Sequence, residues 1–236
     1  MKFGIFSNNV LKIIACITML IDHMGVLLFP KITILRIIGR IAFPIFAFLL
    51  AEGCYYTRNK IRHLLVISGF AAVMQVVLFL ATRMTDFSIF IHFSIAVLLC
   101  LVIDLIEKFI KERKVIVSIA LVLSFLISVI MLILIDKNTT YFFSNYGLYG
   151  IFVPVVLYII RKYIKHVHLL VSIIVICLSM VLMHFFTVWM YQLYGMIACV
   201  FILLYNGKKG KYNLKYLFYI FYPLHLVILY AIALIL

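Results

Sequence analysis

Hydrophobic residues follow one another in long runs along this chain, separated only by short polar connections. A helix that crosses a membrane needs about 20 mostly apolar residues. Nine segments meet or approach that length, and the sixth and eighth fit it least well. They span residues 10–29, 35–57, 63–82, 88–107, 115–135, 146–160, 168–187, 189–205 and 214–236. The pattern predicts an all-α, polytopic membrane bundle that forms a single domain over residues 1–236.

The first apolar run is also the candidate for a targeting segment. It is too long for the core of a signal peptide and has no cleavage site of the small-x-small type, so we expect it to remain as a span. The composition supports the membrane interpretation, because 68% of the residues are hydrophobic and only 12% are charged. Soluble domains are about half apolar and about a quarter charged, so a soluble fold is excluded.

The basic residues indicate topology. The chain has 21 Lys and Arg against 7 Asp and Glu, for a formal net charge of +14. These cations cluster between the apolar runs, where the positive-inside rule places them, so no nucleic-acid partner is predicted. If the N-terminus is cytoplasmic, 16 of the 21 basic residues fall inside and 5 outside. This alternation predicts nine spans with the N-terminus inside and the C-terminus outside. Membrane lipids are then the expected surroundings of the spans.

The five cysteines lie inside apolar runs and show no spacing typical of a metal site. Their number is odd, and neither a CxxC pair nor a Cys/His ligand pattern occurs. We expect neither a disulfide nor a metal centre.

Ionisable residues inside the predicted spans are the candidates for function, because each costs about 2.5–3.5 kcal/mol to insert. They are Asp22, His23, Arg36, Arg40, Glu52, His92, Asp104, His184 and His225. The first two spans form a hairpin that turns near Pro30-Lys31, so residues equally distant from the turn share a depth. This predicts two ion pairs, Asp22 with Arg40 or Arg36, and Lys12 with Glu52. Such pairs either hold two helices together or form part of a site.

Two histidines are predicted to lie at one level in the membrane. At about 1.5 Å per residue, His23 in the first span and His225 in the last both lie about 15–20 Å from the cytoplasmic face. A single buried His is usually satisfied by a carbonyl or a Tyr hydroxyl, whereas this pair beside Asp22 indicates chemistry or proton movement. His92 and His184 fall near the outer ends of spans and are interpreted as interfacial. Asp104 is expected to pair with Lys108 one turn on.

The cytoplasmic connection Tyr205–Lys211 combines two glycines with Lys208, Lys209 and Lys211. Glycines can take positive φ, and together with lysines they suit a turn that holds phosphates. The GK[ST] ending of a P-loop is missing, however. An ordinary positive-inside turn is the simpler interpretation. Pro223, two residues before His225, frees a backbone carbonyl and can open space there.

Three stretches together are similar to a known family. They are Leu11-Lys12 running to Ile21-Asp22-His23-Met24-Gly25; Arg36-Ile-Ile-Gly39-Arg40 with Pro44 and Ala51-Glu52-Gly53; and Tyr205-Asn-Gly-Lys-Lys-Gly210 followed by Leu217-Phe-Tyr-Ile-Phe-Tyr-Pro-Leu-His225. They resemble the TraX family of membrane acetyltransferases, whose namesake acetylates the N-terminal amine of pilin subunits. The likeness covers residues 10–80 and 200–236. More distantly, the first hairpin resembles transmembrane acyltransferases such as the heparan-α-glucosaminide N-acetyltransferase.

The resemblance implies an enzyme of a bacterial cytoplasmic membrane that takes acetyl-CoA from the cytoplasmic side as co-substrate and uses no metal. The acceptor is an amine or a hydroxyl reached from the outer side, on a pilin, another exported peptide, a glycan or a lipid. The implied site consists of three groups. The catalytic group is His23, His225 and Asp22; the substrate or oxyanion group is Arg36, Arg40 and Glu52; the CoA group is Lys12, Lys208 and Lys209.

Roles follow as hypotheses. His23 acts as general base or carries the acetyl group, with His225 as proton partner. Arg36 or Arg40, anchored by Asp22, stabilises the oxyanion or positions an acidic acceptor. Lys12, Lys208 and Lys209 attract the CoA phosphates. Two alternatives remain, a proton-coupled transporter or flippase and a catalytically silent assembly factor, although no inverted repeat supports the transporter.

Overall fold

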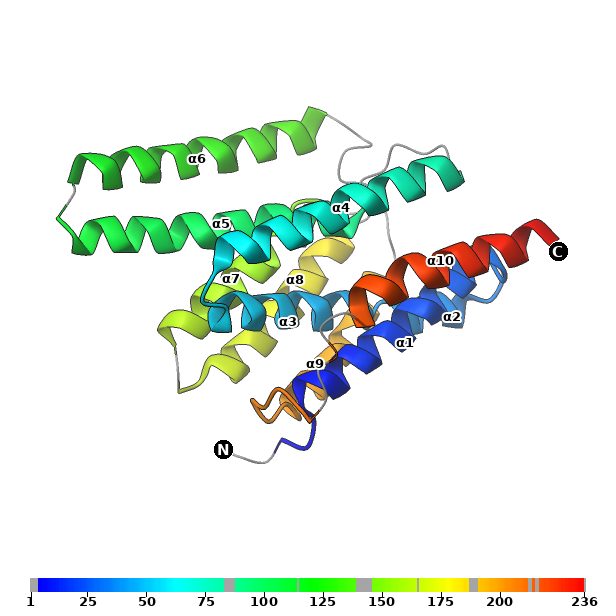
Figure 1. The fold of residues 1–236 in the computed structure, drawn as a ribbon. Helices are drawn as coiled ribbons and strands as arrows, with labels where there is room; N and C mark the ends of the chain where they lie inside the picture. Colours follow the sequence, from blue (N-terminus) through cyan, green and yellow to red (C-terminus); the bar gives the residue numbers. More distant parts are fainter. Residues whose placement is uncertain are drawn as a thin grey trace. The chain divides into compact units, whose positions relative to one another are not determined.

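The computed structural model describes residues 4–82, 88–113, 115–138, 146–164, 166–186, 191–211, 214 and 217–235. These residues form ten α-helices and one 3-10 helix (Figure 1), and the all-α prediction is confirmed. The elements are α1 (Asn8–Leu27), α2 (Thr33–Gly39), α3 (Ala42–Tyr56), α4 (Lys60–Thr82), α5 (Ile89–Lys111), α6 (Val115–Asn138), α7 (Tyr149–Tyr163), α8 (His168–Phe186), η1 (Gln192–Ile197), α9 (Ala198–Leu203) and α10 (Leu217–Ile235).

Five helical stretches are long and apolar enough to cross a membrane. They are Asn8–Leu27, Thr33–Tyr56, Lys60–Phe79, Ile89–Lys111 and His168–Phe185. Two shorter apolar helices cover Gln192–Leu203 and Tyr219–Ile235. The chain is therefore a membrane protein built from apolar helices, while the nine-span topology stays a prediction. Of the basic residues used for that topology, Lys2, Arg83, Lys114, Lys165 and Lys215 lie outside the described residues.

The chain divides into two compact units. The first contains residues 1–52 and 159–236, and the second contains residues 53–158, so the division falls inside α3 and inside α7. In the first unit, α1 lies between α2 and α10 and contacts both, and α8 packs on η1 and α9 (Figure 1). In the second unit, α5 packs against α4 and α6. All residues of the predicted catalytic group belong to the first unit.

The second predicted span, residues 35–57, is broken rather than continuous. α2 ends at Gly39, Arg40 and Ile41 form a turn, and α3 begins at Ala42. Pro44 explains the break, because it has no N–H to donate to the carbonyl of Arg40 and its ring crowds that carbonyl. The break leaves Arg40 between two helices, where its side chain is 5% exposed.

The eighth predicted span, residues 189–205, is also irregular. Its described part begins with the 3-10 helix η1 and continues as α9. Gly195 in η1 packs closely, since a methyl group there would lie 2.7 Å from Met180 Sδ and 3.2 Å from the Arg40 carbonyl oxygen. Close backbone approach thus brings η1 against the α2–α3 turn.

The N-terminal segment and the Tyr205–Lys211 connection hold each other. The amide of Phe6 donates to the Leu204 carbonyl at 2.8 Å, that of Asn206 to the Phe6 carbonyl at 2.9 Å, and that of Asn8 to the Lys208 carbonyl at 2.8 Å. Gly207 and Gly210 adopt φ of 74° and 94°, as predicted for this turn. Ser7 caps α1 by accepting from the Val10 amide at 3.4 Å.

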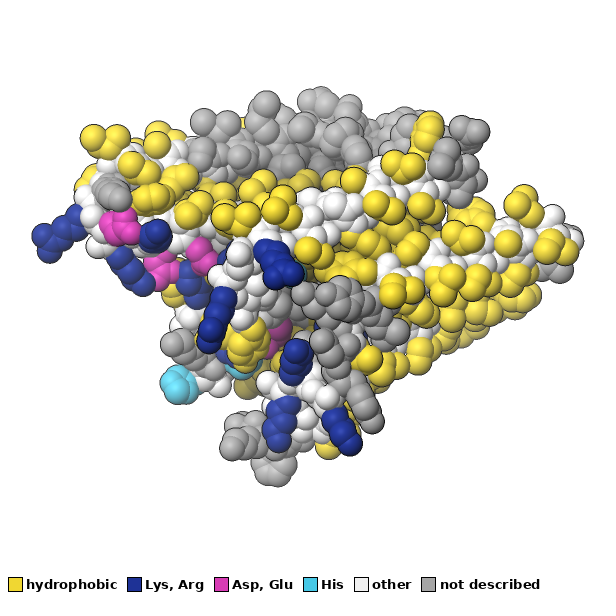
Figure 2. Space-filling view, in the orientation of Figure 1, with side chains coloured by type: hydrophobic (Ala, Val, Ile, Leu, Met, Phe, Trp, Pro, Cys, Tyr) yellow, Lys and Arg dark blue, Asp and Glu magenta, His cyan; other side chains and the backbone are white. Residues whose placement is uncertain are grey.

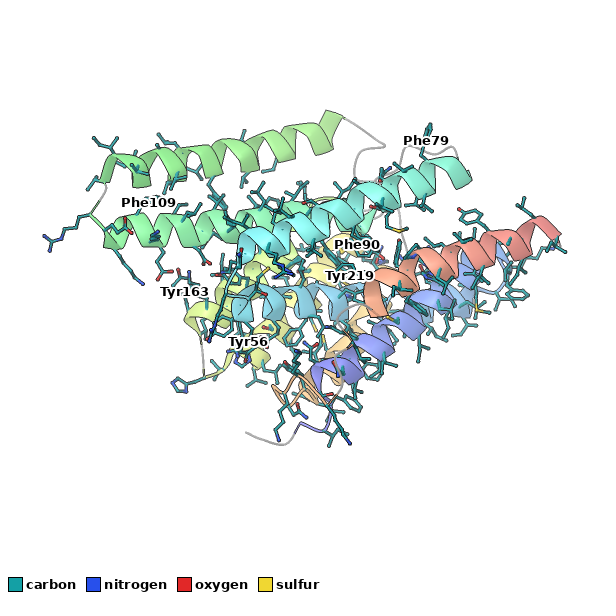
Figure 3. All side chains as sticks on the ribbon, viewed as in Figure 1. Tyr56, Phe79, Phe90, Phe109, Tyr163 and Tyr219 are labelled. Atoms are coloured by element: carbon teal, nitrogen blue, oxygen red, sulfur yellow. The ribbon has the colours of Figure 1, made fainter. Side chains whose placement is uncertain are left out.

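The surface is that of a membrane protein. Figure 2 shows long hydrophobic areas, including the visible sides of α1 and α10, whereas Lys and Arg gather near helix ends. Aromatic side chains labelled in Figure 3 mark several of these ends, such as Tyr56 on α3 and Tyr163 on α7, which are 57% and 58% exposed. Apolar sides with polar and aromatic ends are typical of helices in a bilayer.

Candidate functional site

His23 and His225 meet in the first unit. Nε2 of His225 lies 3.0 Å from Nδ1 of His23, and the ring centroids are 5.0 Å apart. His23 lies on α1 and is half-buried, whereas His225 on α10 is 5% exposed. The packing of α1 against α10 brings the two rings together, as their equal predicted level implies.

The hydrogen bonds of the pair specify where its protons lie. Nδ1 of His225 is 2.7 Å from the carbonyl oxygen of Phe221, which only accepts, so Nδ1 of a neutral His225 carries the proton. Nε2 of His225 is then an acceptor and receives the Nδ1 proton of His23. A neutral His23 therefore keeps a lone pair on Nε2. This network assigns the tautomers, and it gives His23 the orientation of a general base with a positioning partner behind it.

Aromatic rings fix the pair in place. The Phe221 ring stacks on His225 with centroids 4.9 Å apart, and Tyr222 meets His225 and His23 edge-on at 5.4 and 6.0 Å. Rings packed in this way restrict imidazole rotation, which preserves the hydrogen-bond chain.

Asp22, the residue before His23 on α1, is a carboxylate bound by two guanidinium groups. Nη2 of Arg40 lies 2.7 Å from both oxygens of Asp22, and Nη1 of Arg36 lies 2.8 Å from Oδ2. The sequence predicts that Asp22 pairs with Arg40 or Arg36, and in the structure it pairs with both. Gly39 makes this possible, because a Cβ there would overlap the Asp22 carboxylate. The three side chains together carry one net positive charge, suited to a developing oxyanion or an anionic substrate group.

Glu52 lies with Arg161 and not with Lys12, which corrects the predicted pair. Oε1 of Glu52, a residue 2% exposed, is 2.6 Å from Nε of Arg161, and Tyr205 donates its hydroxyl to Oε2 at 3.3 Å. The hairpin count predicts a level for Glu52, but the direction of its side chain depends on α7, which sequence spacing does not place. For this reason the sequence analysis did not identify Arg161 and Tyr205 as partners of Glu52.

The three lysines assigned to CoA occur near the N-terminal end of α1. Lys208 and Lys209 are exposed in the connection that is hydrogen-bonded to residues 6 and 8, and Lys12 is half-buried on α1. The charges of Lys12 and Lys209 are close enough to interact. The arrangement offers several cations to a polyanion.

Other predicted polar residues have structural partners. His92 is 1% exposed, and its Nδ1 lies 3.2 Å from the Ser88 carbonyl, so it is buried rather than interfacial. Asp104 pairs with Lys60 and accepts from the Tyr158 hydroxyl, and Lys108 pairs with Glu112 at 3.8 Å, so the predicted Asp104–Lys108 pair is wrong. His184 on α8 is half-buried. Within the described part of the chain, no group of three or more His, Cys, Asp or Glu side chains is arranged to hold a metal ion.

Comparison with known proteins places this chain in a family. The probable fimbrial assembly protein FimC, serogroup H1, of Dichelobacter nodosus is 26% identical over 95% of this chain and 94% of its own length. An uncharacterised protein of Rickettsia prowazekii is 47% identical over 55 residues, which are 23% of this chain and 22% of that protein. No solved structure matches the chain. The family described as TraX protein matches residues 7–233, and the chain belongs to the TraX family.

Proposed function

We propose that this protein is a membrane-embedded acetyltransferase that moves an acetyl group from cytoplasmic acetyl-CoA to an amine on the other side of the membrane. The proposal rests on the series of hydrogen bonds from the Phe221 carbonyl through His225 to His23. This series leaves Nε2 of His23 as a base inside a hydrophobic bundle. A positioned base of this kind contributes about 10²–10⁴-fold to a proton-transfer step.

In the proposed reaction, the acceptor nitrogen attacks the thioester carbonyl while His23 Nε2 removes its proton. The C–N bond forms, the C–S bond breaks, and the proton passes to the leaving CoA thiolate. The guanidinium groups of Arg40 and Arg36, held by Asp22, stabilise the oxyanion of the tetrahedral intermediate. His225 keeps the Nδ1 proton of His23 in place and acts as a positioning residue.

The donor enters from the cytoplasmic side in this proposal. Lys208, Lys209 and Lys12 attract the phosphates of CoA, and the pairing of residues 6 and 8 with the lysine connection holds these cations near α1. Glu52 acts indirectly, since its bond with Tyr205 anchors the same connection.

The proposed acceptor is the N-terminal amine of an exported peptide such as a fimbrial or pilin subunit. Membership of the TraX family and the similarity to a protein named for fimbrial assembly support this choice over a glycan or a lipid. The proposal includes nine spans with the N-terminus inside, in the cytoplasmic membrane of a bacterium. His23 then lies at a mid-membrane depth that both substrates reach.

The decisive experiment follows acetyl transfer in purified full-length protein. We would add acetyl-CoA labelled on the acetyl group, measure CoA release, and compare peptides with free and blocked N-termini as acceptors. Wild type should transfer to free N-termini, and His23→Gln should be slower by at least about 100-fold because the base is lost. His184→Gln, another half-buried histidine of the first unit, is the matched control and should keep the wild-type rate.

Two results would reject the proposal. Full-length, folded His23→Gln protein that transfers at the wild-type rate would exclude His23 as base. If wild type neither binds nor cleaves acetyl-CoA with any acceptor, including amino sugars, the enzyme assignment fails, and proton-coupled flux in sealed vesicles becomes the competing function to measure.

A further inference from the structure

A second cluster of reactive groups lies within residues 53–158, away in sequence from the histidine pair. It consists of Cys54 near the end of α3, Lys60 and His63 in the first turn of α4, and Cys100 on α5. The two cysteines are free thiols that are 1% and 2% exposed. Nothing in the proposed acetyl transfer uses these residues.

Cys54 has a base and a second thiol beside it. His63 and Cys100 both lie close to the Cys54 thiol. A methyl group at Gly53 would lie 3.8 Å from Nε2 of His63, so the imidazole packs against α3 next to Cys54. That Nε2 is buried and has no hydrogen-bond partner among the residues the structure describes. No bond to another group therefore competes for this nitrogen as a base for the thiol.

A fixed cation completes the surroundings. The charge of Lys60 acts on Cys54, and Lys60 forms an ion pair with Asp104 on α5. Its Nζ also donates to the Tyr158 hydroxyl at 2.5 Å and lies 4.5 Å above the Tyr158 ring. Thiols with a nearby His and Lys are the ones that act as nucleophiles, whereas cysteines in purely apolar surroundings are inert.

The thiol lies close to the end of its helix bundle. Cys54 is two residues before the end of α3, and the connection to α4 includes Arg58 and Asn59, which are exposed. His63 is itself half-buried. About one helical turn of sequence thus separates Cys54 from the exposed connection.

We propose that Cys54 is a nucleophilic thiol that accepts an acyl group from a thioester, with His63 as its base. The identity of the donor as acetyl-CoA rests on the proposed function. In the step, the Cys54 sulfur bonds to the carbonyl carbon while the bond from that carbon to the CoA sulfur breaks. His63 takes the Cys54 proton and returns it to the leaving thiolate. Thioester is exchanged for thioester, so no oxidant or other co-reactant is needed.

The test uses the full-length protein in detergent and two acetyl-labelled thioesters, acetyl-CoA and the small S-acetyl-N-acetylcysteamine. Peptide mapping should locate the label on Cys54 in a form that neutral hydroxylamine releases. Cys54→Ser should lose the label, and His63→Gln should be labelled at least about tenfold more slowly. Cys177→Ser is the matched control and should be labelled like wild type, because Cys177 contacts Cys199 at 3.6 Å in the other unit.

The outcomes separate this proposal from the acetyltransferase proposal. Label on Cys54 that persists in His23→Gln supports the thiol even if transfer to the acceptor is lost. Label from the small thioester but not from acetyl-CoA supports the nucleophile and rejects CoA as its donor. No label on Cys54 from either thioester, or equal labelling of His63→Gln, overturns the proposal whatever the rate of acceptor acetylation. Thermal unfolding of Cys54→Ser and His63→Gln checks that both variants fold.

Discussion

At the scale of single residues, the direction of one hydrogen bond decides what His225 does. Because its Nδ1 proton is held by the Phe221 carbonyl, its Nε2 accepts from His23. Another side chain that places a hydrogen-bond acceptor at the position of Nε2 should therefore perform the role of His225. We predict that His225→Gln keeps much of the acetyl-transfer rate, whereas His225→Phe, which fills the space without an acceptor, lowers it by about 10²-fold. Steady-state rates of CoA release would measure both.

The comparison of these two variants separates positioning from packing. Equal losses in His225→Gln and His225→Phe, with thermal stability unchanged, would mean that His225 itself transfers protons. Equal retention in both would mean that the ring only fills space between α1 and α10.

Relative level along paired helices is the part of the site that a sequence predicts well. A fixed rise per residue converts spacing into level, which is why His23 and His225, and Asp22 and Arg40, were expected to meet. The same count placed Lys12 level with Glu52, yet Glu52 binds Arg161. The level of a residue along its helix does not show which way its side chain points around the helix axis. It also does not show which helices distant in sequence lie beside it. Partners such as Arg161 for Glu52 and Lys60 for Asp104 therefore needed the structure.

At the scale of elements, the contact between α1 and α2 depends on one missing side chain. Gly39 on α2 lies against Asp22 on α1, whose carboxylate is fixed by Arg40 and Arg36 and cannot move aside at low cost. We predict that Gly39→Ala destabilises the protein by about 1–3 kcal/mol, the usual cost of overpacking. The melting temperature in detergent should fall.

Gly69 supplies the matched control for this substitution. It lies inside α4, and a Cβ there would meet nothing within 4 Å. Because Ala favours a helix over Gly by up to about 1 kcal/mol, Gly69→Ala should leave the melting temperature unchanged or raise it. A Gly39→Ala protein as stable as Gly69→Ala would contradict the close approach of α1 and α2.

The connection after α9 is anchored to α3 by a hydroxyl bond whose role can be tested kinetically. Tyr205 donates to Glu52 on α3, and its neighbour Asn206 is hydrogen-bonded to Phe6. Removing the hydroxyl costs about 1 kcal/mol of anchoring, so we predict that Tyr205→Phe raises KM for acetyl-CoA about fivefold and leaves kcat unchanged. A fall in kcat with unchanged KM would instead assign Tyr205 to the chemical step.

At the scale of the whole molecule, the all-helical class follows from hydropathy alone, but the course of individual helices does not. An apolar run specifies a helix, since no other single segment satisfies its own backbone in lipid. It does not reveal that Pro44 separates α2 from α3 or that Gly195 lies in a 3-10 turn packed on the Arg40 carbonyl. These breaks occur where two backbones or a backbone and a charged side chain approach each other. The Gly195 turn is set by tertiary packing, whereas the α2–α3 break follows from Pro44, and both lie beside Arg40 of the candidate site.

The charge pattern makes a prediction about the whole chain, because sixteen of the 21 basic residues fall on one predicted side. Single cysteines would replace four exposed residues, Lys31, Asn59, Lys209 and Leu234. A maleimide that does not cross membranes should label Lys31→Cys and Leu234→Cys in intact spheroplasts, and Asn59→Cys and Lys209→Cys only after permeabilisation. Wild type reports the background of the native thiols. Labelling of Leu234→Cys only after permeabilisation would require an even number of spans. His225 would then approach the membrane from the opposite side, and the depth argument that pairs it with His23 would have to be replaced.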